Sequence, residues 1–513
     1  MLNLSYLVEF QAREYPNRTA VIFNDTKLSY GQLNVLANQF ANGLVSIGVK
    51  PGDKVALMMP NIPYFPIAYY GILKTGATVV PFNVLFKGRE VAYHIKDSDS
   101  VVLIVFEGFA EHAYEGFQQV DSCHTMVIAT TDPKAPSPIQ GDGVMTMGQL
   151  MYNQPVTFDT HHGSSEDTAV ILYTSGTTGS PKGAELTHSN MVLNAITSSR
   201  LGDGNPSDIY LATLPLFHSF GQTVVMNAAF YAGASITMLP RFKPDDALRI
   251  MERDNVTIFV GVPTMYWAMM TYPQADKFDL DKIAKNLKLC ISGGAALPLE
   301  VLRGFEKKFD VPILEGYGLS ETSPAASFNV RDKERKPGSI GVPVWGTEMK
   351  IVDPETDEEK PVGEVGEVVI RGHQVMKGYY KKPEATERTM RNGWFHSGDL
   401  GRMDEDGYFY IVDRLKEMII RGGYNVYPRE VEEYLMTHPK ISLVAVKGVP
   451  NEKYGEEIKA YVVLKPGETM TTEEFIEFAK KGLADYKYPR LVEFRSELPM
   501  TATGKILKRE LKD

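Results

Sequence analysis

Glycines, hydroxyl side chains and one lysine are concentrated in residues 173–188, which read YTSGTTGSPKGAELTH. Glycines let backbone amides approach a ligand closely, the hydroxyls add hydrogen-bond donors, and Lys182 adds a positive charge. This combination predicts a cradle for a polyphosphate. It is not a Walker loop, because Pro181 stands where that pattern needs glycine, and Gly183 follows the lysine in place of serine or threonine. A flexible surface linker is the alternative, but the apolar strand that precedes the segment argues against it.

A second segment, residues 315–322 (EGYGLSET), brings small residues, an aromatic ring and carboxylates together. Gly316 and Gly318 could begin a dinucleotide fingerprint, but the third glycine of that pattern would fall at Glu321, so a Rossmann site is not predicted. The Glu321 carboxylate is a suitable hard ligand for magnesium, which also takes phosphate oxygens as ligands. Taken alone, a glutamate at such a position is more often a solvated charge.

Five segments occur in an order that resembles the acyl-adenylate-forming enzymes, the superfamily of acyl-CoA synthetases, adenylation domains and firefly luciferase. They are the glycine-rich loop, residues 315–322, Gly398-Asp399, residues 413–430 and residues 499–505. The resemblance runs from about Leu28 to Lys508 and is strongest to bacterial medium- or long-chain fatty-acid CoA ligases. It implies that ATP and a carboxylic acid form an acyl-AMP, from which the acyl group passes to coenzyme A.

The resemblance also implies which residues contact the nucleotide. Tyr317 would pack on adenine, Asp399 would accept hydrogen bonds from both ribose hydroxyls, and Arg414 would make a second ribose or phosphate contact. Residues 293–295 would form one wall of the adenine and acyl pocket, although tight core packing explains such small residues equally well. The complete implied set is Thr174, Ser175, Gly176, Thr177, Thr178, Gly179, Lys182, Gly293, Gly294, Ala295, Glu315, Gly316, Tyr317, Gly318, Asp399, Ile411 and Arg414, with Gly422 and Gly423 beside the pantetheine arm of coenzyme A.

The same resemblance implies four residues at the reacting groups: Lys505, His218, Glu321 and Thr322. Attack of a carboxylate on the α-phosphate brings anions together, so a lysine that reaches both, here Lys505, would stabilise the transition state. Thr322 would contact the α-phosphate, and Thr177 with Glu321 would help to hold Mg²⁺. A basic solvated tail is the alternative explanation for Lys505, because other basic residues follow it.

Two positions bear on the acid that is activated. His218 lies where acyl-CoA synthetases carry a histidine near the acyl carboxylate, whereas amino-acid-activating relatives usually place an aspartate there, so an amino acid is not expected. Gly318 lies where short-chain relatives block the acyl tunnel with a tryptophan, which predicts room for a larger acyl or aryl group. A fatty acid is the preferred interpretation, an aryl acid of the 4-coumarate or benzoate type is the alternative, and a nucleotide-sensing module without turnover is a third.

The elements that must position these residues predict an α/β fold. Helix-period and strand-like segments alternate from residue 30 to about 270, which favours largely parallel sheets, and residues 335–412 form short runs broken by glycine and proline. We therefore expect a large N-terminal domain (1–412) of α/β subdomains plus a small β-barrel-like part, and a smaller α+β C-terminal domain (419–513). The resemblance implies that a hinge (413–418) joins them, that the C-terminal domain is mobile, and that rotation about Asp413 would replace Lys505 by Gly422 and Gly423 at the active centre.

Composition limits the remaining classes of function. The 513 residues include 54 Lys+Arg and 64 Asp+Glu, a net charge of −10 that argues against a broad surface for nucleic acid. Two cysteines, Cys123 and Cys290, cannot form a disulfide framework or a four-cysteine metal site, and burial is expected for both. No secretory signal or run of 18 apolar residues is present, which predicts a cytoplasmic protein without a transmembrane segment and leaves peripheral membrane contact open. A monomer or homodimer is expected.

Overall fold

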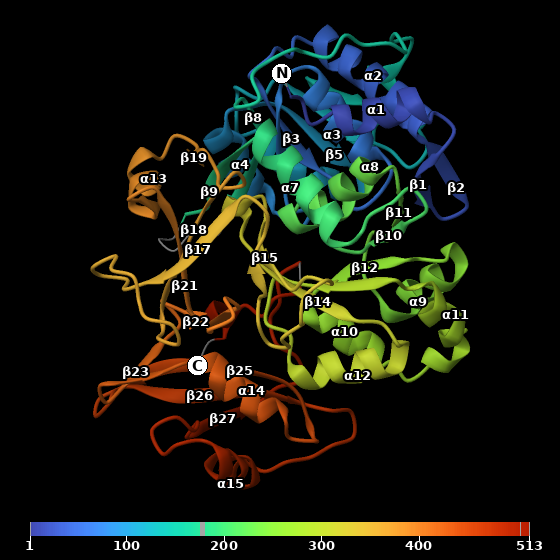
Figure 1. The fold of residues 1–513 in the computed structure, drawn as a ribbon. Helices are drawn as coiled ribbons and strands as arrows, with labels where there is room; N and C mark the ends of the chain where they lie inside the picture. Colours follow the sequence, from blue (N-terminus) through green and yellow to red (C-terminus); the bar gives the residue numbers. More distant parts are fainter. Residues whose placement is uncertain (1, 175–179, 503, 512–513) are drawn as a thin grey trace.

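The computed structural model describes residues 2–174, 180–502 and 504–511. These residues form a large N-terminal domain of mixed α/β structure and a smaller C-terminal domain, which confirms the predicted fold class. In Figure 1 the C-terminal residues, coloured orange to red, lie against one end of the N-terminal domain. The exact division at residues 412, 413 and 418 stays a prediction.

One large sheet contains the strands that flank the glycine-rich segment. Among the described residues it has eight strands, in the order β19 (Gly378–Tyr379), β9 (Lys182–Thr187), β8 (Thr168–Thr174), β4 (Thr78–Pro81), β3 (Lys54–Met58), β5 (Ser100–Phe106), β6 (Thr125–Ala129) and β7 (Val144–Thr146). From β8 to β7 neighbouring strands are parallel, and their near-continuous apolar runs are buried on both faces.

The strand β9 corrects one expectation. The sequence predicted a strand only before the phosphate loop, but a second strand, β9, lies between the loop and α7 and pairs antiparallel with β8. Lys182 is the first residue of β9 and pairs with Thr174, the last residue of β8. The glycine-rich segment therefore connects two paired strands, and its ends are held next to each other by the ladder.

The second large sheet carries residues 313–318 near one end. In the described part of the chain its nine strands follow the order β16 (Val342–Pro343), β15 (Ala325–Phe328), β14 (Ile313–Gly318), β13 (Leu289–Ser292), β12 (Ile258–Gly261), β10 (Ile209–Ala212), β11 (Ser235–Met238), β1 (Thr19–Phe23) and β2 (Thr26–Ser29). Strands β14 to β10 are parallel, so the chain leaves β13 and β14 at the same edge, where the predicted adenine-binding residues begin.

Helices connect and cover these two sheets (Figure 1). The first of the long ones begins at a capping box in which Ser29 and Gln32 satisfy each other's backbone amides. The helices of the N-terminal domain are α1 (Tyr6–Glu14), α2 (Tyr30–Ser46), α3 (Tyr64–Lys74), α4 (Gly88–Ser98), η1 (Glu107–Phe109), α5 (Ala110–Phe117), α6 (Met147–Met151), α7 (His188–Leu201), η2 (Phe220–Asn227), α8 (Ala228–Ala232), α9 (Pro244–Asp254), α10 (Pro263–Met270), η3 (Ala275–Lys277), α11 (Leu280–Asn286), α12 (Leu299–Phe309), η4 (Ser320–Thr322) and α13 (Pro383–Thr389).

The β-rich part between residues 335 and 412 is an antiparallel sheet. It consists of β17 (Thr347–Val352), β18 (Gly366–Gly372), β21 (Trp394–Met403) and β20 (Met390–Arg391), with β22 (Phe409–Arg414) paired to β21. Residues 378–380 were expected in this part, but β19 instead pairs with β9 in the first sheet. That pairing brings Tyr379 to the strand that follows the glycine-rich segment.

The C-terminal domain has a sheet and a hydrophobic core of its own. Its elements are β23 (Ile419–Arg421), β24 (Tyr424–Val426), α14 (Pro428–Met436), β25 (Ile441–Asn451), β26 (Gly455–Leu464), α15 (Thr472–Gly482), β27 (Leu491–Phe494) and η5 (Lys508–Glu510). Buried side chains of α14, β25, β26 and α15 pack together without help from the N-terminal domain. The domain is therefore able to keep its shape if it changes position.

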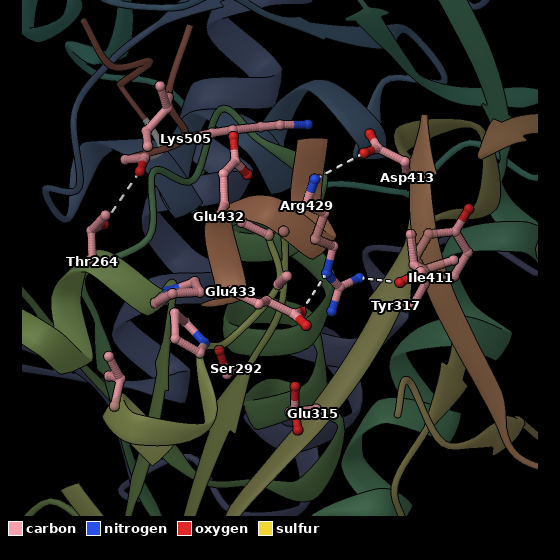
Figure 2. Close-up of a pocket in the computed structure, with 18 of the residues that line it drawn as sticks. Thr264, Ser292, Glu315, Tyr317, Ile411, Asp413, Arg429, Glu432, Glu433 and Lys505 are labelled. Atoms are coloured by element: carbon pink, nitrogen blue, oxygen red, sulfur yellow. Dashed lines mark hydrogen bonds and ion pairs between the residues drawn. The ribbon is translucent and has the colours of Figure 1, made fainter. Parts of the chain in front are cut away.

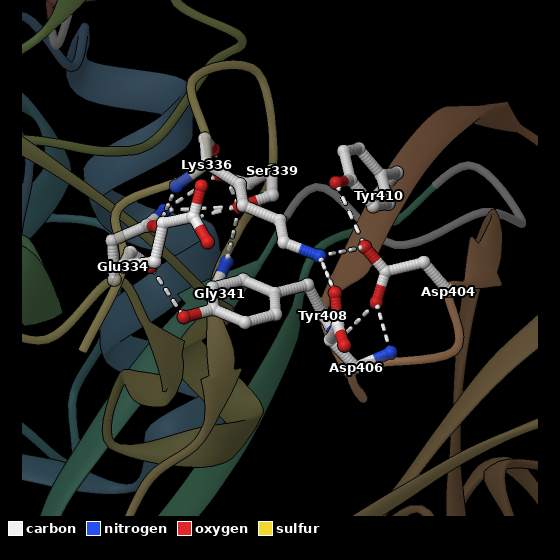
Figure 3. Close-up of polar contacts among 9 residues, drawn as sticks. Glu334, Lys336, Ser339, Gly341, Asp404, Asp406, Tyr408 and Tyr410 are labelled. Carbon is white, nitrogen blue, oxygen red and sulfur yellow. Dashed lines mark hydrogen bonds and ion pairs between the residues drawn. The ribbon is translucent and has the colours of Figure 1, made fainter.

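A polar cluster joins the loop between β15 and β16 to the β21–β22 turn (Figure 3). The Lys336 ammonium contacts Asp404 at 2.8 Å and Asp406 at 2.5 Å, and the Tyr410 hydroxyl donates to Asp404. The Tyr408 hydroxyl donates to the carbonyl of Glu334 in the same loop. These contacts hold the loop, and with it the backbone at Gly338, beside the end of β14.

The expectation that both cysteines are buried is met. Both cysteines are buried and unpaired, and burial raises the thiol pKa of Cys123 to about 12, so neither is activated as a nucleophile. Within residues 2–174, 180–502 and 504–511, no helix has the length and apolar character needed to cross a membrane.

Candidate functional site

A cavity of about 310 Å³ lies between the two domains. Side chains and backbone from the carboxyl ends of β13 and β14, from α10, from β21 and β22, and from the C-terminal domain line it (Figure 2). The sequence-predicted residues that the structure brings together here are Gly294, Ala295, Glu315, Gly316, Tyr317, Gly318, Asp399, Ile411, Arg414 and Lys505.

Asp399 is the buried carboxylate at the centre of this group. It accepts a hydrogen bond from the Tyr317 hydroxyl at 2.6 Å, and its other oxygen lies 3.1 Å from Nε of Arg414. Burial and the Asp399 carboxylate raise the pKa of Tyr317, so the tyrosine stays protonated and donates. The β21–β22 ladder pairs Asp399 directly with Arg414, which explains how residues 15 positions apart meet.

Lys505 enters the same cavity from the C-terminal domain. Its backbone amide donates to the Thr501 hydroxyl, and the preceding carbonyl, that of Gly504, accepts a hydrogen bond from Thr264 of α10 at 3.3 Å. Burial and the nearby Arg414 lower the pKa of Lys505. The loop is thus docked on the N-terminal domain with a desolvated ammonium group directed to the site.

His218 does not line this cavity but lies near it. Burial and the positive charge of Lys505 lower the pKa of His218 to about 4, so the ring is neutral at pH 7. Its Nδ1 accepts a hydrogen bond from the amide of Phe220, which leaves the proton on Nε2. A neutral imidazole can hydrogen-bond a carboxylate through this proton.

A second polar group surrounds Glu321, outside the cavity lining. One oxygen of the buried Glu321 carboxylate accepts hydrogen bonds from Thr174 at 3.1 Å and from Tyr379 at 2.9 Å. The Lys182 ammonium lies 5.1 Å from the centre of the Tyr379 ring, and burial with the positive charges of Arg388 and Lys416 lowers the pKa of Lys182. Lys182 thus lies among other positive charges and is also attracted by the Glu321 carboxylate, an arrangement suited to a polyphosphate with a divalent cation.

Thr322 is turned into the fold. Its side chain is completely buried, and its hydroxyl donates to the carbonyl of Pro324, while its contact with the α-phosphate stays a prediction. The hydroxyl of Ser320 is partly exposed instead and lies 3.5 Å from that of Ser219. The sequence places serine and threonine two positions apart, and only the turn of η4 decides which one is covered.

The structure explains why position 318 is a glycine, which the sequence did not indicate. A Cβ atom at this position would lie 1.8 Å from the carbonyl oxygen of Pro324, because β14 and β15 approach closely where their register shifts. The absence of a side chain is therefore required by the backbone itself, and glycine here is not in itself an indication of an open acyl tunnel. Gly293 is also in close contact, since a Cβ there would lie 3.1 Å from the ring of Phe220.

Several predicted residues lie elsewhere or outside the described residues. Gly422 and Gly423 form the exposed turn between β23 and β24, with φ of +58° and +83°, and do not line the cavity. Thr174, Lys182 and Glu321 form the separate polar group described above. The predicted ligands Ser175, Gly176, Thr177, Thr178 and Gly179, and thus half of the predicted Mg²⁺ pair, lie outside the described residues.

The sequence missed the part of the cavity wall that comes from domain packing. Thr264 in α10 and Arg429 in α14 both line the cavity, together with Asp413, Glu432 and Glu433. Burial raises the pKa of Glu315, another lining residue, to about 7. Tyr379, which donates to Glu321, was likewise missed. A Gly-Tyr-Tyr run was visible, but its partner strand lies almost 200 residues earlier, so no local pattern reveals the contact.

Comparison with known proteins places the chain in a family. The model for "AMP-binding enzyme" matches residues 8–380, and that for "AMP-binding enzyme C-terminal domain" matches residues 430–505. The chain is 39% identical to a long-chain-fatty-acid–CoA ligase of Bacillus subtilis (99% of this chain, 94% of the relative) and 36% identical to a feruloyl-CoA synthase of Amycolatopsis sp (98% and 97%). The solved structure of the anthranilate CoA ligase AuaEII in complex with anthranoyl-AMP superposes with a TM-score of 0.91 at 30% identity (99% and 96%). The chain belongs to the AMP-binding enzyme family.

Proposed function

We propose that this protein is an ATP-dependent, AMP-forming fatty-acid–CoA ligase. In the first step, a carboxylate oxygen of the acid forms a bond to the α-phosphorus of ATP, the bond to the bridging oxygen of the β-phosphate breaks, and pyrophosphate leaves. In the second step, the thiol sulfur of coenzyme A bonds to the carbonyl carbon, the thiol proton is lost, and AMP departs with the electrons of the mixed anhydride bond. No protein nucleophile is needed, in agreement with the two inert cysteines.

The observation that carries this proposal is the meeting of Lys505, Asp399 and Tyr317 in one interdomain cavity. The Tyr317 ring would pack on adenine and the Asp399 carboxylate would accept from the ribose hydroxyls, which orients the α-phosphate toward Lys505. The Lys505 ammonium would then neutralise the charge that gathers between carboxylate and phosphate. A buried cation makes this effect stronger than in water.

The polyphosphate would lie at the group around Glu321. Lys182 supplies positive charge there, with Arg388 and Lys416 close enough to lower its pKa, and Ser320 is partly exposed where Thr322 is buried. We infer that Glu321 helps to hold Mg²⁺, because carboxylate oxygen is the donor this cation prefers and hydrogen bonds from Thr174 and Tyr379 fix the carboxylate in place. When bound, the cation would neutralise phosphate charge. His218, neutral at pH 7, would hydrogen-bond the acid.

The substrate class is supported by the relatives. The Bacillus subtilis relative is a long-chain-fatty-acid–CoA ligase, which favours a medium- or long-chain fatty acid for this chain. The feruloyl-CoA synthase relative, similar over nearly the same length, keeps an aryl acid as the second candidate. Both share the same ATP chemistry, so only the acid distinguishes them.

The test is a substrate panel with the full chain, ATP and Mg²⁺. Palmitate, octanoate and coumarate are compared by pyrophosphate release and, after addition of coenzyme A, by thioester formation. We expect acid-dependent release with a fatty acid preferred by at least tenfold. Preference for coumarate would select the aryl-acid ligase, and ATP binding without pyrophosphate release for any acid would indicate a nucleotide-binding module instead.

A further inference from the structure

One contact between the domains is made by Arg429, in the first turn of α14. Its Nη1 donates to the carbonyl of Ile411, in β22 just before the predicted hinge, and its Nε donates to Glu433 at 2.9 Å (Figure 2). The Arg429 side chain is only 16% exposed, and its backbone amide donates to Asp413. One residue thus ties the first turn of a C-terminal helix to backbone of the N-terminal domain.

The other contact lies on the far side of the cavity, next to Lys505. The Thr264 hydroxyl in α10 donates to the carbonyl of Gly504, 3.3 Å away. The approach is close, because a Cβ atom at position 504 would come within 2.7 Å of the Thr264 hydroxyl oxygen and 3.1 Å of a methyl of Val262. The loop that carries Lys505 is therefore seated on the start of α10 with no space for a side chain between them.

The two contacts share a property that most others in the C-terminal domain lack. Each joins a residue before Asp413 to a residue after it, so a rotation about Asp413 changes the distance in both. Pairs such as Arg421 with Glu457, or Lys508 with Glu432, lie within the C-terminal domain and would move as one body. The energy of the first two contacts therefore favours one arrangement of the domains, the one in which Lys505 faces the cavity.

We propose that Arg429 and Thr264 are positioning residues that hold the C-terminal domain in the arrangement where Lys505 reaches the α-phosphate. Neither acts on the reacting atoms. Arg429 holds α14 to β22, Thr264 holds the Lys505 loop to α10, and together they fix the loop from two sides of the cavity. The inference rests on the proposed function for its kinetic test, and on the structure alone for its chemical test.

The kinetic test separates the two half-reactions in Arg429→Met and Thr264→Val. Met keeps the apolar stem of arginine, and Val keeps the shape of threonine without its hydroxyl. We expect kcat for pyrophosphate release to fall about 10-fold in R429M, which loses a hydrogen bond from a charged donor, and about 3-fold in T264V, which loses one from a neutral donor. KM for ATP and the rate of thioester formation from supplied acyl-AMP should stay within about twofold of wild type.

Matched controls accompany these variants. Thr264→Ser retains the hydroxyl and should restore wild-type pyrophosphate release. Arg249→Met makes the same exchange in α9, where Arg249 pairs with Asp246 of its own helix and crosses no boundary, so both half-reactions should be unchanged. Equal losses in both half-reactions for R429M and T264V would overturn the proposal, as would full adenylation activity in both.

The chemical test needs no substrate. Brief acetylation with acetic anhydride, followed by site-resolved mass spectrometry, compares the partly buried Lys505 with the exposed Lys480 of α15 in the same sample. We expect Lys505 labelling relative to Lys480 to rise at least twofold in R429M and T264V, but not in T264S or R249M. Unchanged labelling of Lys505 would refute the positioning role even if catalysis changed. Failure of the wild type to release pyrophosphate would instead refute the proposed function, and the labelling result would remain valid.

Discussion

Lys505 illustrates how a single side chain acquires reactivity from its position. An exposed lysine is an ordinary cation, but here burial and Arg414 lower its pKa, and the same loss of water strengthens its attraction for an anionic substrate. The effect depends on the docked loop, so the chemistry of this residue belongs to one arrangement of the two domains. Lys508, close by in sequence, instead pairs with Glu432 of the C-terminal domain and with Glu417 of the predicted hinge.

Replacing Lys505 by alanine tests this role directly. Lys505→Ala should lower acid-dependent pyrophosphate release by at least about 1,000-fold, because the main charge compensation at the α-phosphate is lost. Thioester formation from supplied acyl-AMP should remain largely intact, since that step would not use this lysine. Both half-reactions are measured in the purified variant. An equal loss of thioester formation would contradict the proposal that the two steps use two different arrangements of the C-terminal domain.

Glu315 gives a stability prediction with a defined sign. Its folded-state pKa of about 7 lies above the ordinary value of 4.5, because burial disfavours the charged form. The folded protein therefore holds a proton that the unfolded chain releases above pH 4.5, and stability falls as pH rises from about 4.5 to 7. Above pH 7 the buried Glu315 carboxylate lowers the free energy of unfolding by its full amount, up to about 3 kcal/mol.

Glu315→Gln removes this cost and keeps an acceptor for the Gly338 amide. We expect the variant to melt at a higher temperature than wild type at pH 8, with the difference shrinking toward pH 5, where wild-type Glu315 is protonated in the folded state. Thermal melts followed by circular dichroism at both pH values provide the measurement. Glu477→Gln, on the exposed side of α15, serves as control and should change little; an equal gain for E315Q at both pH values would exclude titration as the cause.

At the scale of elements, the junction from β14 through η4 to β15 does most to shape the site. It places Tyr317 and Gly318 in the cavity wall, Glu321 beside Thr174 and Thr322 inside the fold. The register shift between β14 and β15 brings Pro324 against Gly318. The close approach of the β14 and β15 backbones is thus enough to require glycine at position 318, whatever ligand is bound.

Gly318→Ala tests which requirement dominates. A Cβ 1.8 Å from the Pro324 carbonyl oxygen forces the backbone apart, so we expect a loss of about 1–3 kcal/mol and a lower melting temperature. Gly108→Ala is the control, because its Cβ would meet only the Phe106 ring at an ordinary 3.5 Å. An unchanged melting temperature for G318A, with longer acids lost from the substrate range, would instead support the tunnel role.

At the scale of the whole molecule, two bodies with separate cores meet around one cavity. The exposed turn with Gly422 and Gly423 lies away from that cavity while Lys505 lies in it. If both serve one reaction in turn, the C-terminal domain has to rotate between the two steps. Asp413, which pairs with Leu400 and accepts from the amides of Arg414 and Arg429, is the proposed pivot.

Asp413→Pro should restrict this rotation, because proline fixes φ near −65°. We expect pyrophosphate release within about threefold of wild type and thioester formation reduced at least about 10-fold. Asp413→Asn is the control, because it removes the carboxylate but keeps the backbone freedom and one acceptor oxygen. A loss seen in D413P and not in D413N is therefore due to the rigid backbone. Thioester formation at the wild-type rate in D413P would remove the hinge assignment.

The sequence alone determined much of the fold and the family. The alternation of helix-period and strand-like segments from residue 30 to about 270 predicted the α/β class and its largely parallel sheets, because strands such as β3, β4, β5 and β6 are local apolar runs. The motifs containing Tyr317, Asp399 and Lys505 were also visible, since glycines, carboxylates and a lysine in fixed order limit the chemistry that they can perform.

Only the tertiary structure decided which of these residues meet. The turn of η4 decides whether Thr322 or Ser320 faces solvent. The strand that pairs with β19 lies almost 200 residues earlier in the chain. The hydrogen bonds of Thr264 and Arg429 form only where the two domains touch. Such features arise from packing between segments distant in sequence, which leaves no periodic signal in either segment. The sequence thus determined the chemical groups that this protein has available, and the packing of the two domains determined which of them share one cavity.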